Sequence, residues 1–111
     1  MMKRLDREIV AIPKEKLTEY LLNETHPTGK FKSRLFREFG FTSENAGLLE
    51  KQLYELISNN DIQETIDTQF GTKYIVDGKI YSQDHRPLVI RTVWIKNINE
   101  VEIRFVTAYP L

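Results

Sequence analysis

The sequence predicts an α+β fold in which a short strand and three helices precede an antiparallel sheet of four to five strands. Two observations support this prediction: apolar residues recur at helical spacing up to about residue 59, and beyond Asn60 they alternate with polar residues. The chain has 111 residues, 41% hydrophobic and 29% charged, which is typical of one globular domain. Helices that precede a meander of strands usually pack on one face of the sheet. We therefore expect a single domain over residues 1–111.

The first half of the chain begins with a strand pattern that gives way to two helix patterns. Residues 8–12 are apolar and β-branched, which favours a short strand, and Pro13 suits the first turn of a helix over residues 13–22. A second amphipathic helix is expected over residues 30–39, with Gly40 as its C-cap. A turn should connect these two helices.

A third helix is expected to begin after Thr42 or Ser43, either of which can cap its N-terminus, and to end near residue 59. Glu44 in its first turn favours the helix dipole. Its apolar stripe consists of Ala46, Leu49, Leu53, Leu56 and Ile57. This stripe should face the sheet.

The second half of the chain alternates in strand fashion. The expected strand segments are residues 61–69, 71–76, 79–81, 88–96 and 101–109. Asp77-Gly78 indicates a tight turn between the second and third of them. In the last segment, alternation predicts that one face is shared by Val101, Ile103, Phe105, Thr107 and Tyr109.

The composition excludes several classes of function. The chain has no Cys, which rules out thiol catalysis, iron–sulfur clusters and disulfides. The two histidines, His26 and His85, are far apart in the sequence, and no glycine-rich phosphate loop occurs, so we expect neither a metal nor a cofactor. No signal peptide or long apolar run is present, which predicts a cytoplasmic protein without a membrane segment. The sequence leaves the oligomeric state open.

The net charge is zero, with 16 basic and 16 acidic residues, but the charges are unevenly distributed. The stretch from His26 to Arg37 contains no acidic residue and carries the cations Lys30, Lys32, Arg34 and Arg37. Cations at a loop that leads into a helix N-terminus can hold a phosphate, although a solvated helix face explains the same pattern. The stretch from Glu44 to Asp67 is acidic by contrast, with Lys51 as its single cation.

Arg91 stands within a strand pattern made mostly of buried-type residues. A cation in a central strand is costly unless it is paired or points into a cleft, so Arg91 is a candidate for phosphate binding. A surface position on the face away from the helices is the alternative. His26, beside four cations, is a candidate acid or base, and a simple turn residue before Pro27 is its alternative.

Several segments together resemble the bacterial domain-of-unknown-function 6883 family. They include HPTGKFK at residues 26–32, RTVWI at 91–95 and RFVTAYP at 104–110, with further segments at 16–23, 36–41 and 71–74. The resemblance runs in order over residues 5–111. Members of the family occur alone or at the ends of larger proteins, sometimes beside a small partner gene. The resemblance therefore implies a toxin–antitoxin arrangement with a small cognate antitoxin protein.

A more distant similarity links the helix-then-meander order and the basic His-containing loop to the barnase, EndoU, colicin and RelE group of metal-independent ribonuclease toxins. This similarity implies RNA cleavage by 2′-hydroxyl attack, with catalytic roles for His26, Lys32, Arg91 and Thr107. It further implies RNA contacts from Lys30, Arg34, Lys73, Tyr74 and Tyr109. Core packing that continues the Val101–Phe105 face is the alternative for Thr107 and Tyr109.

Two other functions stay open. A non-catalytic immunity or antitoxin-like domain is favoured by the acidic third helix and the zero net charge, because an acidic face can cover a basic active site. RNA binding without cleavage, through the face formed by Lys30, Arg34 and Arg37, is the third hypothesis, and it predicts affinity that falls steeply with salt.

Overall fold

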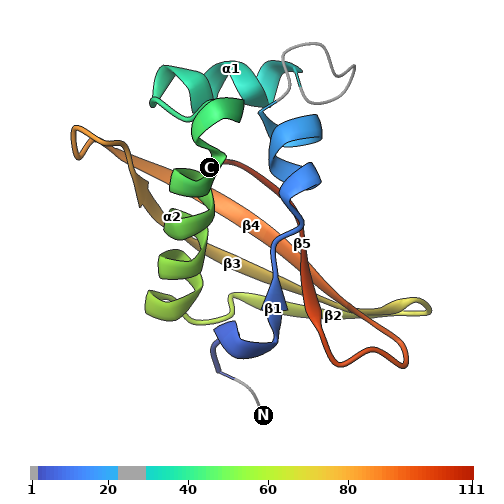
Figure 1. Ribbon diagram of the computed structural model, residues 1–111. Helices are drawn as coiled ribbons and strands as arrows, with labels where there is room; N and C mark the ends of the chain where they lie inside the picture. Colours follow the sequence, from blue (N-terminus) through green and yellow to red (C-terminus); the bar gives the residue numbers. More distant parts are fainter. Residues whose placement is uncertain (1–2, 23–29) are drawn as a thin grey trace.

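The structure is a computed structural model, and it describes residues 3–22 and 30–111, apart from the side chains of residues 30–32. Short 3₁₀- and π-helices are labelled η. The elements in chain order are η1 (Arg7–Ile9), β1 (Val10–Ala11), η2 (Lys16–Leu21), α1 (Lys30–Glu38), η3 (Ser43–Asn45), α2 (Ala46–Asn59), β2 (Glu64–Thr68), β3 (Gly71–Tyr81), β4 (Pro87–Asn97) and β5 (Ile103–Pro110). The α+β prediction is confirmed: α2 crosses one face of the sheet and α1 lies above its upper end (Figure 1).

The sheet is mixed, whereas the sequence pattern predicted an antiparallel one. Its strand order is β1-β5-β4-β3-β2, and every neighbouring pair is antiparallel except β1 and β5. Hairpins enforce antiparallel pairing for β2 to β5. The connection from β1 to β5 runs through all the helices, so it allows either direction.

The expected helix over residues 13–22 forms largely as the π-helix η2, in which Leu22 N donates to Leu17 O at 2.7 Å. Leu17 and Leu21 on this helix are buried. The expected third helix divides into η3 and α2, and Thr42 and Asn45 form a capping box at its start. The N-terminal strand is shorter than expected, because residues 7–9 form η1.

The predicted turn at Asp77-Gly78 is wrong, since β3 runs without a break from Gly71 to Tyr81. Gly78 serves close packing instead: a Cβ there would lie 3.0 Å from Leu56 Cγ and closer still to the Asn60 side chain. Glycine at this position lets α2 approach the strand.

The core lies between the sheet and the helices. Its largest fully buried side chains are Trp94, Phe36, Phe41, Phe105, Leu17, Leu21, Leu22, Leu49, Leu53, Leu56, Ile57 and Ile80. Trp94 packs edge-on against Phe105, with ring centroids 5.2 Å apart. Its indole N–H donates to Thr92 Oγ1 at 2.7 Å, and that hydroxyl donates to Val76 O at 2.7 Å. The buried polar side-chain atoms of Trp94 and Thr92 are therefore satisfied.

A bulge in β5 changes which residues share a face. Phe105 lies opposite Trp94 while Thr107 lies opposite Val93, so Val106 is the extra residue. The prediction that Thr107 and Tyr109 continue the face of Ile103 and Phe105 is therefore wrong. Both side chains lie on the opposite face of the sheet, because one additional residue reverses the alternation. Val101 precedes β5 and is 73% exposed.

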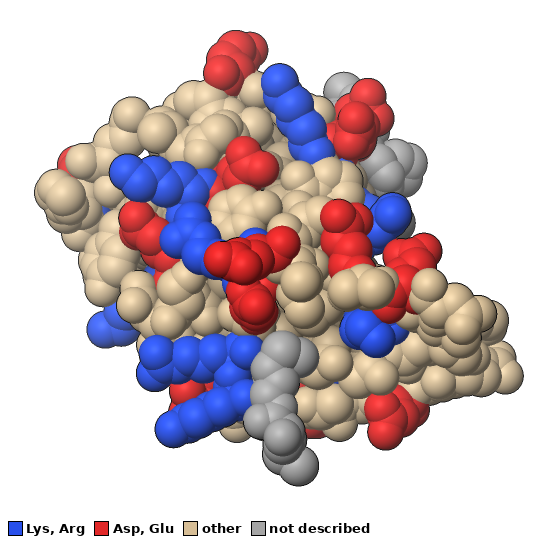
Figure 2. Space-filling view, turned by 60° about the horizontal axis from the view of Figure 1, so that its bottom comes forward, with Lys and Arg blue, Asp and Glu red and all other residues tan. Residues whose placement is uncertain are grey.

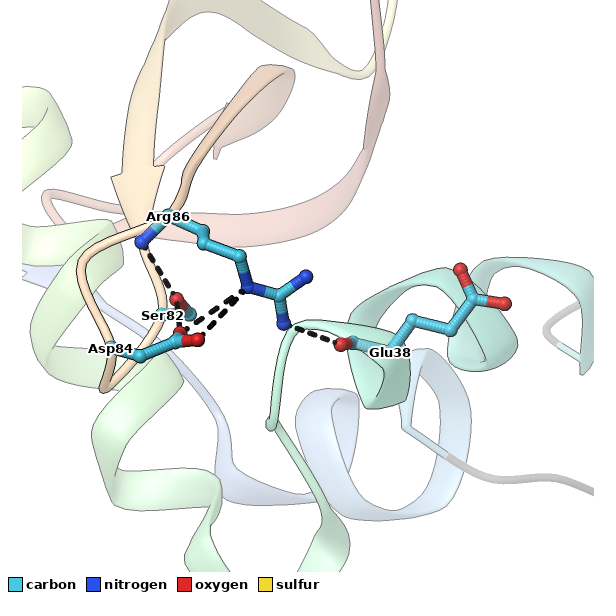
Figure 3. A network of polar contacts seen from close by, with 4 residues as sticks. All are labelled: Glu38, Ser82, Asp84 and Arg86. Carbon is cyan, nitrogen blue, oxygen red and sulfur yellow. Dashed lines mark hydrogen bonds and ion pairs between the residues drawn. The ribbon is translucent and has the colours of Figure 1, made fainter.

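A polar network ties the β3–β4 loop to the end of α1 (Figure 3). Arg86 Nη2 donates to Glu38 O at 2.8 Å, and Arg86 Nε donates to Asp84 Oδ2 at 3.2 Å. The hydroxyl of Ser82 also donates to Asp84, and the Arg86 guanidinium lies 4.8 Å from the Phe39 ring centroid. A cation at the C-terminus of a helix satisfies carbonyls that lack an intrahelical partner.

This network predicts a pH dependence of stability. The hydrogen bond from Ser82, followed by the contact with Arg86, holds the pKa of Asp84 below its ordinary value of 3.8. A carboxylate whose folded pKa is depressed contributes stability above the unfolded pKa and loses it as pH falls through the folded value. We expect part of the acid destabilisation below about pH 4 to disappear in Asp84→Asn. Thermal melts of both proteins between pH 2 and 7 test this, and parallel profiles would contradict it.

Gly71 and Gly40 offer a matched pair for backbone strain. Both have positive φ, +148° and +89°, but a Cβ on Gly71 would collide with the backbone carbonyl of Lys96, whereas no atom of the described residues lies within 4 Å of one on Gly40. We expect Gly71→Ala to lower the free energy of unfolding by about 2–3 kcal/mol and Gly40→Ala by about 1 kcal/mol. Urea denaturation measures both, and equal losses would contradict the steric explanation.

Candidate active site on the open sheet face

The helices pack on one face of the sheet, and we call the opposite face the open face. Strand register and alternation place on it Ile66, Lys73, Ile75, Asp77, Lys79, Val89, Arg91, Val93, Ile95, Arg104, Thr107 and Tyr109. Val89 and Ile66 are 43% and 38% exposed. The open face is thus partly apolar with a few embedded charges.

Asp77, Arg91 and Tyr109 form one row across β3, β4 and β5, because each lies opposite the next in the register. Arg91 Nε donates to Asp77 Oδ1 at 2.8 Å, and Arg91 Nη2 donates to Asp77 Oδ2 at 2.9 Å. The two side chains are 33% and 22% exposed. This is a bidentate ion pair, which fixes the plane of the guanidinium.

The hydrogen bonds from Arg91 to Asp77, together with the contact to Tyr109, raise the pKa of Arg91 above its ordinary value. The guanidinium is therefore charged at every physiological pH. An arginine has five N–H donors, and Asp77 accepts two of them. The donors that contact neither Asp77 nor Tyr109 can bind an anion on the open face. Arg91 thus lies on the face away from the helices, as the alternative predicted, and the ion pair offsets the cost of a cation in a central strand. Phosphate binding by Arg91 stays a prediction.

Thr107 occupies the neighbouring row, opposite Val93. β1 pairs only with Ile103 and Arg104, so Thr107 lies at an edge of the sheet, where its Oγ1 is 3.4 Å from the hydroxyl of Tyr20 in η2. The Lys16 ammonium lies 5.7 Å from the centroid of the Tyr20 ring. π-helical segments are rare and occur frequently at functional sites. Tyr20 thus joins the candidate site from a helix that the sequence pattern marked only as part of the core.

The structure brings together three of the predicted site residues, namely Arg91, Thr107 and Tyr109. Lys73 shares the open face but stands four residues along β3 from Asp77, roughly 13 Å at strand spacing. Tyr74 lies on the other face, where it packs against the core.

The structure describes the predicted residues of the basic stretch only in part. Arg34 is exposed on α1. Lys30 and Lys32 belong to α1 by their backbone, but their side chains lie outside the described part of the chain, and His26 lies outside it altogether. The convergence of these residues on the open face therefore stays a prediction.

Asp77 is the functional candidate that sequence reasoning missed. Asp-Gly is a strong turn signal, and it concealed the position of Asp77 opposite Arg91. The signal that could have pointed to Asp77 was Arg91 itself, because a cation within a strand pattern needs an acidic partner nearby.

Within the described residues, no helix has the length and apolar character to span a bilayer. The same part of the chain holds no group of three or more His, Asp or Glu side chains arranged to ligate a metal ion.

The family model described as "Domain of unknown function (DUF6883)" matches residues 3–111. The chain belongs to the DUF6883 family. No curated protein sequence matches this DUF6883 domain. Among solved structures, it is similar to a chain of the "Contact-dependent growth inhibition toxin - immunity protein complex from Klebsiella pneumoniae 342". The two are 15% identical with a TM-score of 0.70, over 90% of this chain and 98% of that one. At this identity the similarity shows a shared fold.

Proposed function

We propose that this DUF6883 domain is the toxin of a toxin–immunity pair and that it cleaves RNA in the cytoplasm without a metal ion or other cofactor. The observation that carries the proposal is the Asp77–Arg91–Tyr109 row on the open face of the sheet. The fold shared with a chain of a toxin–immunity complex supports the same class of protein.

Arg91 binds the scissile phosphate in this proposal. Its guanidinium is held in place before substrate arrives, since Asp77 accepts two of its N–H groups at 2.8 and 2.9 Å. A preorganised cation stabilises the charge that develops on a pentavalent phosphate without reorganising during the reaction. Thr107, one row away, donates a hydrogen bond to a phosphate oxygen, and Lys32 supplies a second cation.

The reaction is transesterification within the RNA strand. The 2′-oxygen forms a bond to phosphorus as a base removes its proton, and the bond from phosphorus to the 5′-oxygen breaks as an acid protonates that oxygen. The products are a 2′,3′-cyclic phosphate and a 5′-hydroxyl end. His26 is proposed as the base or the acid, since an imidazole changes charge near neutral pH.

RNA is held mainly through its backbone. Lys30, Arg34 and Lys73 contact flanking phosphates, and the ring of Tyr109 stacks on a base beside Arg91. Tyr74 has no part in this proposal, because it packs on the helix side of the sheet.

The immunity-like alternative rests on the acidic third helix and the zero net charge. In the structure Asp61 accepts a hydrogen bond from Arg4 Nε at 2.8 Å and lies 3.8 Å from Lys3 Nζ. Figure 2 shows basic and acidic side chains interspersed over the face that it presents. We prefer the toxin assignment because the Asp77–Arg91–Tyr109 row places a preorganised cation on the open face.

The proposal is tested with the purified full chain, total bacterial RNA and excess EDTA. We expect RNA fragments with 2′,3′-cyclic phosphate and 5′-hydroxyl ends. Their 3′ ends should resist ligation until the cyclic phosphate is removed, and their 5′ ends should accept a phosphate directly from a kinase. Induced expression in a bacterial host should stop growth, and His26→Ala should restore it. Intact RNA and normal growth with folded protein would favour the immunity-like domain.

A further inference from the structure

Strand β3 is longer than its neighbour β2. The pairing of β2 ends at Ile75, opposite Glu64, whereas β3 continues to Tyr81. Among the described residues, the segment Asp77–Tyr81 therefore has β4 on one side and no strand on the other. We call this segment the free edge.

The direction of the backbone groups on the free edge follows from the ladder. Ile75 O accepts from Gln63 N on the β2 side, and Ser82 N donates to Arg86 O on the β4 side, so the even-numbered residues bond towards β4 and the odd-numbered ones away from it. The N–H and C=O groups of Asp77, Lys79 and Tyr81 point outwards. Gln52 Oε1 accepts from Tyr81 N at 2.9 Å, so a side chain of α2 already occupies one of these donors.

A groove of about 470 Å³ runs between the free edge and α2. Its α2 wall presents the amide side chains of Gln52 and Asn59 together with Glu55 and Leu56, and Asn60 follows the helix. Amide groups and outward backbone groups are donors and acceptors that match a peptide main chain.

We propose that an extended segment of a partner polypeptide pairs with the free edge as an additional strand. This inference rests on the proposed function in one respect, namely that the partner is the cognate immunity protein. The main chain of the partner segment bonds to Asp77 and Lys79, and an acidic side chain of the segment lies opposite the exposed Lys79. A second copy of this chain is a less suitable partner. If two copies paired antiparallel through Asp77, Lys79 and Tyr81, the central Lys79 of each would lie opposite the other, and two like charges in that position repel.

The position of the free edge gives the partner a regulatory effect. Asp77 belongs both to the free edge and to the row that holds Arg91. A strand added beside Asp77 extends the open face and places its own side chains next to Asp77, two strand spacings or roughly 10 Å from Arg91. The partner then blocks the approach of RNA without contacting α1.

Hydrogen exchange on the full chain tests the pairing, with the protein encoded by the adjoining gene as the probe. In the free chain we expect fast exchange at the amides of Asp77 and Lys79 and slow exchange at those of Gly78 and Ile80, which bond towards β4. In the complex, the amides of Asp77 and Lys79 should become slow. A complex in which both still exchange fast, or the absence of a complex, would overturn the inference.

Lys79→Pro supplies an independent measurement, because it removes an outward N–H and no ladder bond to β4. We expect it to weaken the complex about tenfold or more, while Lys79→Ala, which keeps the N–H, weakens it less. Unchanged affinity in Lys79→Pro would overturn the pairing. A dimer of the chain alone, detected by light scattering and lost in Lys79→Pro, would reassign the free edge to a second copy. Slow exchange of the Asp77 and Lys79 amides in the complex, together with intact RNA, would support the edge pairing and reject only the proposed ribonuclease activity.

Discussion

Arg91→Ala is expected to reduce RNA cleavage by about 10²–10³-fold, the loss typical of removing one preorganised donor from a transition-state oxyanion. Arg91 is held by two hydrogen bonds to Asp77, so its position does not depend on substrate. The loss should appear in kcat more than in KM, because the charge on phosphate grows in the transition state. Cleavage of a short labelled RNA under single-turnover conditions measures it.

Two variants separate the role of Arg91 from the general effect of charge. Arg104→Ala removes an exposed cation from the same face, at the opposite end of the sheet, where it pairs with Glu100 and Glu102. It should leave the cleavage rate within about twofold, because surface pairs of this kind contribute little. Asp77→Asn keeps the shape of the row while weakening its hold on Arg91, and we expect an intermediate loss. Equal rates for Arg91→Ala and wild type would remove the open face from the proposed mechanism.

Trp94→Ala is expected to lower the free energy of unfolding by about 3–5 kcal/mol, the range for removing a large aromatic side chain from a core. Trp94 is fully buried between the sheet and the helices, in contact with Phe105. Its removal also deprives Thr92 of a donor to its hydroxyl. Urea denaturation followed by circular dichroism measures the loss.

Val101→Ala is the control for this experiment, since Val101 is 73% exposed and lies outside the strands. It should change the free energy of unfolding by about 0.5 kcal/mol or less. A loss under 1.5 kcal/mol for Trp94→Ala would show that the core tolerates the cavity or refills it.

The same denaturation experiment applies to the Arg91 variant. Arg91 lies three residues from Trp94, on the other face, so Arg91→Ala should leave the unfolding midpoint far less affected than Trp94→Ala.

Local patterns in the sequence determined the α+β class, the order of the elements and the family. The apolar stripe of α2 and the alternation in β4 depend on 3.6- and 2-residue periods, which neighbouring residues carry by themselves. The cost of a buried cation likewise marked Arg91 as a residue that needs a partner or a ligand.

Contacts between distant segments decided the rest. The direction of β1 depends on β5, more than 90 residues later, and no local pattern specifies it. Asp77-Gly78 has the composition of a turn, but packing of α2 over Gly78 and the ion pair with Arg91 keep it in a strand. The bulge at Val106 moved Thr107 and Tyr109 to the open face, because one extra residue reverses every side chain that follows it. The candidate site forms because these long-range contacts place Asp77, Arg91 and Tyr109 in one row across the sheet.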